Sequence, residues 1–198
     1  MPVTVIAHDE RLEGRSPVGS ASTIVIDVNE ETPIADFFDR IVEIFNSNGL
    51  IDRLYIMAHG VLVTSEDTSA IMFCREFISY RTVDQFSRLR DKVDRIILFV
   101  CHAAESTMTR HGDGDELCRQ IALNAHAEVT AAREEQAYSQ TETCHVLFCE
   151  ESAIEFGEWE GPVVVYGRDG NILAEFQNPS VVRGPNGELF DPRISSPH

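Results

Sequence analysis

The sequence has no long apolar run: its longest uninterrupted stretch, Ile96 to Cys101, spans six residues. A helix that crosses a bilayer needs about 20 apolar residues, so we expect neither a transmembrane segment nor a membrane partner. Residues 1–14 contain no basic stretch followed by an apolar one, and a secretory signal is not expected either.

Cysteines are few and scattered. There are five, an odd number: Cys74, Cys101, Cys118, Cys144 and Cys149. Such a set does not indicate a disulfide framework, and it predicts a reducing, cytoplasmic compartment.

Basic residues are scarce as well. Lysine and arginine total 16 against 33 aspartates and glutamates, which gives a formal net charge of −17. A chain this acidic repels phosphate backbones, so no nucleic-acid partner is expected. The sequence also lacks a P-loop and a G-x-G-x-x-G after a strand, the two glycine-rich loops that cradle phosphates. We therefore expect no nucleotide and no other cofactor.

What the sequence does contain is enough apolar material for a packed core. Hydrophobic residues make up 43% of the 198 residues, which suits one domain. Residues 1–177 are predicted to form that domain. Residues 178–198, rich in Pro, Gly, Asn and Ser, are predicted to form an extended tail, and residues 9–22 a loop.

Strand and helix patterns alternate along the domain. A helix is predicted after Thr32, its expected N-cap, and before Gly49, with a second helix starting at Thr82 and a third over about 116–126. Strands are predicted over residues 23–28, 54–58, 70–78, 95–100, 128–132 and 146–149, and a C-terminal hairpin over 162–166 and 172–176. This alternation predicts an α/β three-layer sandwich: a mostly parallel central sheet with helices on both faces.

Two of the predicted strands end in residues that can carry chemistry. LYIMA is followed by His59-Gly60, and RIILFV by Cys101-His102. Cys101 lies 42 residues after His59, with one predicted helix between them. Ligands in parallel sheets bind at the carboxyl ends of the strands. We therefore expect His59 and Cys101 to meet at ends that lie side by side or one strand apart.

These residue types can form a catalytic dyad. A cysteine nucleophile reacts as the thiolate, and a nearby imidazole can take its proton or protonate a leaving amine. The glycine after the histidine leaves a backbone N–H open to substrate. That N–H and the amide of Cys101 could together bind an oxyanion.

An apolar block that ends in His-Gly, followed 40–50 residues later by one that ends in Cys, resembles the caspase-like cysteine peptidases. This superfamily includes caspases, metacaspases, legumain, clostripain, gingipains, separase and the bacterial CHAT domains. The resemblance covers roughly residues 20–135. It implies a caspase-like fold, with His59 as catalytic histidine, Cys101 as nucleophile and Gly60 as a contributor to the oxyanion hole.

The chain departs from the family pattern around the cysteine. Bulky Val100 precedes Cys101 where relatives usually have a small residue, and His102 follows it where caspases have Arg-Gly. Phe99 occupies a position that often shapes the substrate pocket, with Gln, Asp or Glu there in relatives. If Phe99 lines the pocket here, an apolar preference or a blocked pocket follows.

We therefore interpret the chain as a cysteine endopeptidase that hydrolyses peptide bonds of a peptide or protein substrate through an acyl-enzyme. The first alternative is an inactive caspase-like domain that binds a partner protein. A second is an unrelated flavodoxin-like binding domain. Nothing in the sequence indicates the oligomeric state.

Other residues permit weaker interpretations. Cys101-His102, Cys144-His145 and Cys149 suggest zinc, but their spacing does not match common zinc sites, and no metal is expected. Asp113, Asp115 and Glu116 suggest a helix N-cap rather than a calcium loop. If extended, His102 would point away from Cys101, so we interpret it as structural or orienting. The rival bases for Cys101 are His111, ranked second after His59, and His126.

Overall fold

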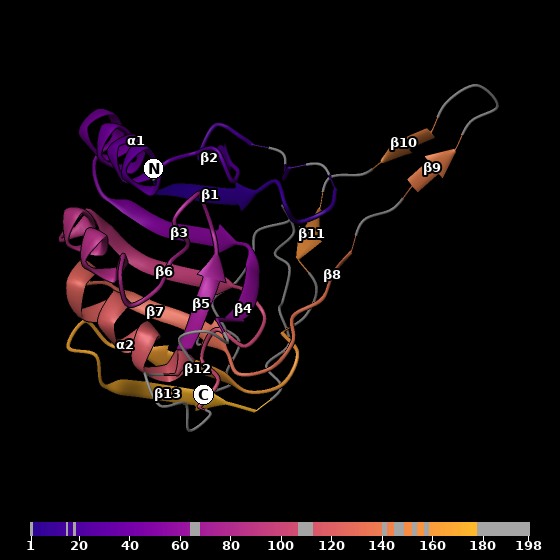
Figure 1. The fold of residues 1–198 in the computed structure, drawn as a ribbon. Helices are drawn as coiled ribbons and strands as arrows, with labels where there is room; N and C mark the ends of the chain where they lie inside the picture. Colours follow the sequence, from indigo (N-terminus) through magenta and orange to yellow (C-terminus); the bar gives the residue numbers. More distant parts are fainter. Residues whose placement is uncertain are drawn as a thin grey trace, which may run out of the picture.

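A seven-stranded sheet forms the frame of the molecule in the computed structural model, which describes residues 2–14, 16–17, 19–63, 68–106, 113–139, 142–144, 149–151, 154–156 and 159–177 (Figure 1). The strand order is β13-β12-β7-β6-β3-β1-β2. The strands are β1 (Val3–Asp9), β2 (Thr23–Val28), β3 (Ile51–Met57), β6 (Val93–Phe99), β7 (Glu128–Ala132), β12 (Val163–Tyr166) and β13 (Ile172–Phe176). Within this order, β2, β1, β3, β6 and β7 pair in parallel. Strand β12 pairs antiparallel with β7, and β13 pairs antiparallel with β12. The predicted α/β class with a mostly parallel sheet is confirmed.

Strand β1 was not expected from the sequence. It lies between β2 and β3, with Val5 and Ala7 completely buried. Its apolar stretch, Val5–Ala7, is too short to show a period, and the strand is identified only by the neighbours that cover it. The predicted loop over 9–22 therefore begins at the end of a central strand.

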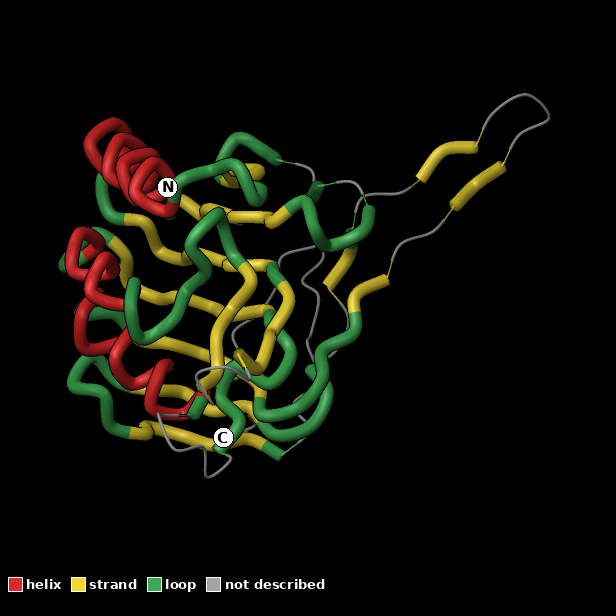
Figure 2. Tube along the Cα trace, viewed as in Figure 1, coloured by secondary structure: helices red, strands yellow, loops and turns green. Residues whose placement is uncertain are grey.

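All three described helices pack against one face of the sheet (Figures 1 and 2). They are α1 (Ile34–Asn48), the 3-10 helix η1 (Val83–Leu89) and α2 (Gly114–Ala125). Edge-to-face contacts join Phe38 to Phe37 and to Phe86, so α1 and η1 share one core. Within the described ranges, none of these helices is both long and apolar enough to cross a membrane.

The other face carries no helix in the described part of the chain, unlike the expected layer of helices on both faces. A second core cluster there includes Tyr55, Met57 and Phe99, and residues outside the central sheet, Leu12 and Trp159 among them, cover it. The direction of the crossovers explains this. The helix connections run from β2 to β3, β6 and β7, always the same way along the sheet, and right-handed crossovers in one direction place every helix on one face.

Antiparallel pairings complete the described part of the fold, one at the edge of the central sheet and three outside it. The predicted C-terminal hairpin is confirmed: β12 pairs with β13, and Gly170 turns between them with a φ of +75°. Strands β4 (His59–Val63) and β5 (Thr68–Met72) form a separate hairpin in place of a strand over 70–78. Strand β8 (Tyr138–Ser139) pairs with β11 (Glu155–Phe156), and β9 (Glu142–Cys144) with β10 (Cys149–Glu151). Residues 146–148 of the predicted strand 146–149, and the predicted tail 178–198, lie outside the described residues.

Helix α1 begins differently from the prediction. Pro33, not Thr32, occupies the N-cap position, and the Thr32 hydroxyl instead accepts a hydrogen bond from the Asn29 amide. The first helical amide, that of Ile34, donates to Glu76 Oε2 at 2.8 Å. This hydrogen bond holds the pKa of Glu76 below its ordinary value of 4.5. A carboxylate from a distant loop therefore caps the helix.

We expect Glu76→Ala to lower the free energy of unfolding at pH 7 by about 1 kcal/mol, the usual cost of a lost cap. Because the native pKa is depressed, this contribution is complete above the unfolded pKa and disappears as pH falls through the native one. Urea titrations between pH 7 and pH 3 check both points. A Glu76→Ala chain whose stability equals that of the unmodified chain at pH 7 would contradict the capping role.

Candidate active site

The two strand ends singled out in the sequence are neighbours. Strand β3 pairs directly with β6 in parallel, and Met57 lies opposite Phe99. Two residues beyond this pair come His59 on one side and Cys101 on the other. Of the two arrangements expected from the sequence, the side-by-side one is correct.

A close backbone contact joins the two ends beyond the sheet. A Cβ atom built on Gly60 would lie 1.8 Å from the carbonyl oxygen of Cys101 and 3.3 Å from Val100 Cγ1. No side chain fits in that space, so only glycine permits the first residues of β4 to rest on Cys101. Since consecutive Cα atoms are about 3.8 Å apart, His59 is held one residue away from the Cys101 backbone.

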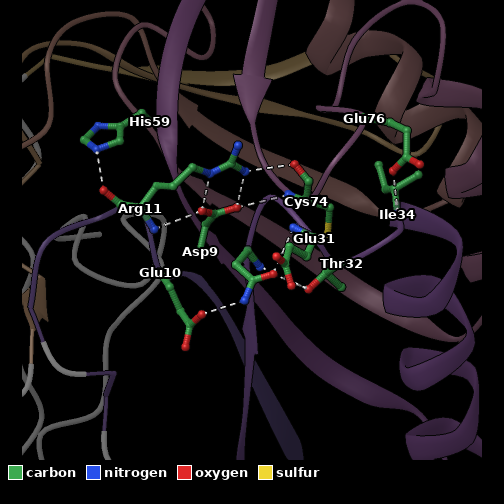
Figure 3. A network of polar contacts seen from close by, with 10 residues as sticks. Asp9, Glu10, Arg11, Glu31, Thr32, Ile34, His59, Cys74 and Glu76 are labelled. Atoms are coloured by element: carbon green, nitrogen blue, oxygen red, sulfur yellow. Dashed lines mark hydrogen bonds and ion pairs between the residues drawn. The ribbon is translucent and has the colours of Figure 1, made fainter.

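The His59 imidazole is half-buried, and a backbone carbonyl orients it. Its Nε2 lies 3.3 Å from the carbonyl oxygen of Arg11, in the loop after β1 (Figure 3). A carbonyl oxygen can only accept, so this hydrogen bond requires the tautomer with the proton on Nε2. Nδ1 then carries the free lone pair and is the nitrogen that can act as a base.

A buried ion pair fixes the Arg11 backbone. The fully buried Asp9 carboxylate accepts from the Arg11 amide at 3.1 Å, from Nε at 2.7 Å and from Nη2 at 2.6 Å. The Cys74 amide also donates to Asp9, and Arg11 Nη2 donates to the Cys74 carbonyl (Figure 3). The hydrogen bonds that the Arg11 side chain donates to Asp9 raise the pKa of Arg11 above its ordinary value. The carbonyl that orients His59 is therefore held by a charged, hydrogen-bonded clamp.

The Cys101 sulfur faces a different segment. Cys101 is half-buried, and its Sγ donates to the carbonyl oxygen of Gln136 at 3.6 Å and accepts from the Gln136 amide at 3.4 Å. Both backbone groups of one residue thus contact the thiol. In the structure, the sulfur and the imidazole each hydrogen-bond to backbone groups rather than to each other.

The Gln136 side chain holds that segment in place. It is 7% exposed, and its Nε2 donates to the carbonyls of Glu135 at 2.6 Å and Glu160 at 2.8 Å. Its Oε1 accepts from the Glu160 amide at 3.3 Å. The amide group therefore ties the segment after β7 to the one before β12, with the Cys101 sulfur beside it.

His102 is not extended, contrary to the assumption used to orient it. It adopts a left-handed conformation with φ of +55°, its amide donates to the Glu134 carbonyl at 3.0 Å, and its Nδ1 lies 3.3 Å from Glu105 Oε2. Cys74 and Phe77, beside Arg11, also have positive φ values. Strained backbone of this kind is common around functional sites.

The remaining sequence candidates lie at different distances from this centre. Phe99 is buried in the second core cluster, its ring 4.7 Å from that of Trp159, and a role in a substrate pocket stays a prediction. His126 ends α2 and pairs with Asp91, just before β6, so it lies at the opposite end of the strand from Cys101. His111 is outside the described residues.

Two further expectations concern the helix α2 region and metals. Asp113 caps α2 by accepting from the Glu116 amide, which confirms the N-cap interpretation. Cys118 is buried on the same helix. Within the described ranges, no three His, Cys, Asp or Glu residues gather into a set that could hold a metal ion.

Asp9, the Arg11 carbonyl and Gln136 were not expected from the sequence. An Asp-x-Arg one residue after the apolar stretch Val5–Ala7 was the available signal for the first two, but it required the recognition of β1. Gln136 acts through its backbone and through hydrogen bonds to the backbones of Glu135 and the distant Glu160, which leave no pattern in a single sequence.

Comparisons with known proteins add no relative: no family model, curated protein or solved structure matches this chain.

We expect Gly60→Ala to push β4 away from Cys101, because the new methyl group would overlap the Cys101 carbonyl. Overpacking of this kind costs about 1–3 kcal/mol of stability. Chemical denaturation measures it. Gly49→Ala is the control: Gly49 is the C-cap residue of α1, and a Cβ there meets nothing within 4 Å, so any loss comes only from its φ of +84°. Equal losses in the two variants would contradict the close contact.

We expect Cys101, but neither Cys74 nor Cys118, to react with iodoacetamide at pH 7.5 in the folded chain. Burial raises the pKa of Cys74 to about 12 and that of Cys118 well above its ordinary range. Peptide mapping after a timed reaction checks this, and urea should make all three react. Modification of Cys74 or Cys118 at the same rate as Cys101 before unfolding would contradict the assignment.

Proposed function

We propose that the chain is a caspase-like cysteine endopeptidase in which Cys101 is the nucleophile and His59 the base. The observation that carries the proposal is the contact of Gly60 with the Cys101 carbonyl, at the adjoining carboxyl ends of β3 and β6. It puts an imidazole-bearing residue and a thiol-bearing residue at one edge of the sheet. Cys101 is half-buried, whereas Cys74 and Cys118 are buried.

The reaction follows from the roles of these groups. His59 Nδ1 takes the proton of the Cys101 thiol, and the sulfur attacks the scissile carbonyl to form a C–S bond. The backbone amides of Gly60 and Cys101 hold the oxyanion. His59 then gives the proton to the leaving amine as the C–N bond breaks. Water hydrolyses the acyl-enzyme and restores the thiol.

The Arg11 carbonyl serves this chemistry indirectly. It accepts a hydrogen bond from Nε2–H, which keeps Nδ1 as the basic nitrogen and stabilises the imidazolium that forms when Nδ1 is protonated. Asp9 is the positioning residue behind it, since its carboxylate fixes the Arg11 backbone. No third catalytic side chain is required.

Gln136 defines the step that must precede attack. Its carbonyl accepts a hydrogen bond from the Cys101 thiol. Because the thiol proton has to pass to His59, the sulfur must first leave this hydrogen bond. We infer that the sulfur leaves it by rotation of the Cys101 side chain about χ1, a move between staggered rotamers. A substrate carbonyl seated beside Gly60 would favour that rotation.

The hydrogen bonds between the Cys101 sulfur and the Gln136 backbone support a second candidate function, a non-catalytic domain that binds a partner protein. If the Gln136 backbone holds the sulfur permanently, Cys101 is a structural thiol. The buried side chain of Gln136, with its hydrogen bonds to Glu135 and Glu160, makes this segment resistant to movement.

A peptide-based thiol electrophile separates the two functions. We expect such a reagent to label Cys101 at neutral pH and His59→Ala to slow labelling by at least about 100-fold, the low end of general-base effects. His126→Ala is the matched control, because His126 lies at the other end of β6. The expected rate for that variant equals that of the unmodified chain.

A peptide library then tests turnover. Cleavage that disappears in both Cys101→Ser and His59→Ala supports the endopeptidase. Labelling that is slow and equal in the unmodified chain and His59→Ala, with no cleavage of any peptide, would favour the binding domain. Substrates with apolar, acidic and basic residues before the cut also test the apolar preference inferred from Phe99.

A further inference from the structure

Backbone hydrogen bonds anchor the turn that follows Cys101, residues 101–104, to the end of the neighbouring strand. The amide of His102 donates to a carbonyl just beyond β7 at 3.0 Å, and that of Ala104 to the carbonyl of the last residue of β7 at 2.8 Å. Within the described ranges, no backbone carbonyl accepts from the amide of Cys101. The turn is therefore held by other amides, and the Cys101 N–H stays available to an oxyanion.

Two side chains hold the carbonyls of the same turn. Cys118 Sγ, on α2, donates to the Ala103 carbonyl at 3.1 Å, and Arg133 Nη1 donates to the Ala104 carbonyl at 2.8 Å. Ala104 is completely buried. Because a buried polar group that loses its partner is costly, the turn depends on Arg133 to keep this carbonyl where it is.

The first residue of α2 also rests on the turn. A Cβ atom built on Gly114 would lie 2.4 Å from the carbonyl oxygen of Ala103, and the Gly114 amide donates to the Glu105 carbonyl at 3.0 Å. The contact is of the same kind as that between Gly60 and Cys101. Both glycines thus let a neighbouring backbone approach the turn more closely than a side chain would permit.

The Arg133 guanidinium is itself fixed by two carboxylates. Its Nε donates to Glu175 Oε1 at 3.1 Å, and its Nη2 lies 3.5 Å from Asp115 Oδ1. Asp115 is held in turn, since it accepts from the Tyr166 hydroxyl at 2.8 Å and from Arg119 Nε at 2.7 Å. A guanidinium presents its donors in a rigid, planar fork, so partners on three sides determine where its Nη1 points.

We propose that Arg133 is a positioning residue for the oxyanion hole: it fixes the Ala104 carbonyl and, through the turn, the direction of the Cys101 amide. This inference rests on the peptidase function proposed above. Arg133 donates to the turn and not to the Cys101 sulfur. It therefore acts on the step in which charge develops on the substrate oxygen, and not on the reactivity of the thiol.

Two reagents that both react with Cys101 separate these steps in the full chain. Iodoacetamide alkylates the sulfur by displacement of iodide, and no oxyanion forms. A peptide aldehyde adds the sulfur to its carbonyl carbon, and its oxygen, which gains the negative charge or the thiol proton, enters the oxyanion hole. We expect Arg133→Met to weaken aldehyde binding, measured by calorimetry, by about 100-fold, the low end for a lost oxyanion donor. The alkylation rate should equal that of the unmodified chain.

Two further variants separate this role from general destabilisation. Arg119→Met is the matched control, because Arg119 donates to the same Asp115 and to the Gly170 carbonyl rather than to the turn. Its aldehyde affinity should equal that of the unmodified chain. Gly114→Ala changes no charge but should displace the Ala103 carbonyl, and so weaken aldehyde binding as Arg133→Met does.

Hydrogen exchange tests the support of the turn without any activity. The amides of His102 and Ala104 should exchange at least about tenfold faster in Arg133→Met than in Arg119→Met, because only the first variant loosens the turn locally. A chain that binds no peptide aldehyde would contradict the peptidase function, and this role with it. Unchanged aldehyde affinity in Arg133→Met, equal losses of alkylation and aldehyde binding, or equal exchange in the two arginine variants would overturn the role of Arg133 alone.

Discussion

The contact between Gly60 and the carbonyl oxygen of Cys101 is the constraint on which the candidate site depends. A Cβ atom at residue 60 would overlap that oxygen, so the chain after β3 can turn onto the end of β6 only because residue 60 is glycine. The contact does not rely on either reactive side chain. It fixes the backbones from which the imidazole and the thiol project, and each side chain is then oriented by a carbonyl from another loop: Arg11 for His59, Gln136 for Cys101.

These two carbonyls act differently on the two side chains. The Asp9–Arg11 clamp is buried and charged, and it holds the histidine in one tautomer with its basic nitrogen available. The Gln136 segment is tied by neutral hydrogen bonds and holds the thiol proton away from that nitrogen. In the proposed peptidase, His59 has its basic nitrogen oriented by the Arg11 carbonyl, whereas Cys101 would first have to change rotamer to leave the Gln136 carbonyl. The peptidase and the binding domain differ only in whether that change takes place.

Much of the frame could be predicted because it follows from local periodicity. The stripe of Ile34, Phe37, Phe38 and Ile41 identifies α1, and the apolar block before Cys101 identifies a buried central strand. Since consecutive parallel strands in such sheets tend to be neighbours, the residues after them were expected to meet, and β3 does pair with β6. The features that escaped prediction are long-range. The helices lie on one face because the crossovers all run the same way, β1 is recognisable only by its neighbours, and the hydrogen bonds of Arg11 and Gln136 involve backbone atoms that every residue possesses.

The most direct test of this account is a crystal structure of the chain with a peptide aldehyde bound as a reversible adduct. The account predicts a C–S bond to Cys101 and the adduct oxygen about 2.7–3.1 Å from the amides of Gly60 and Cys101. His59 Nδ1 should face the reacting centre while Nε2 stays on the Arg11 carbonyl. An adduct on a different cysteine, or a Cys101 sulfur still bound to Gln136 with the His59 ring turned away, would contradict it.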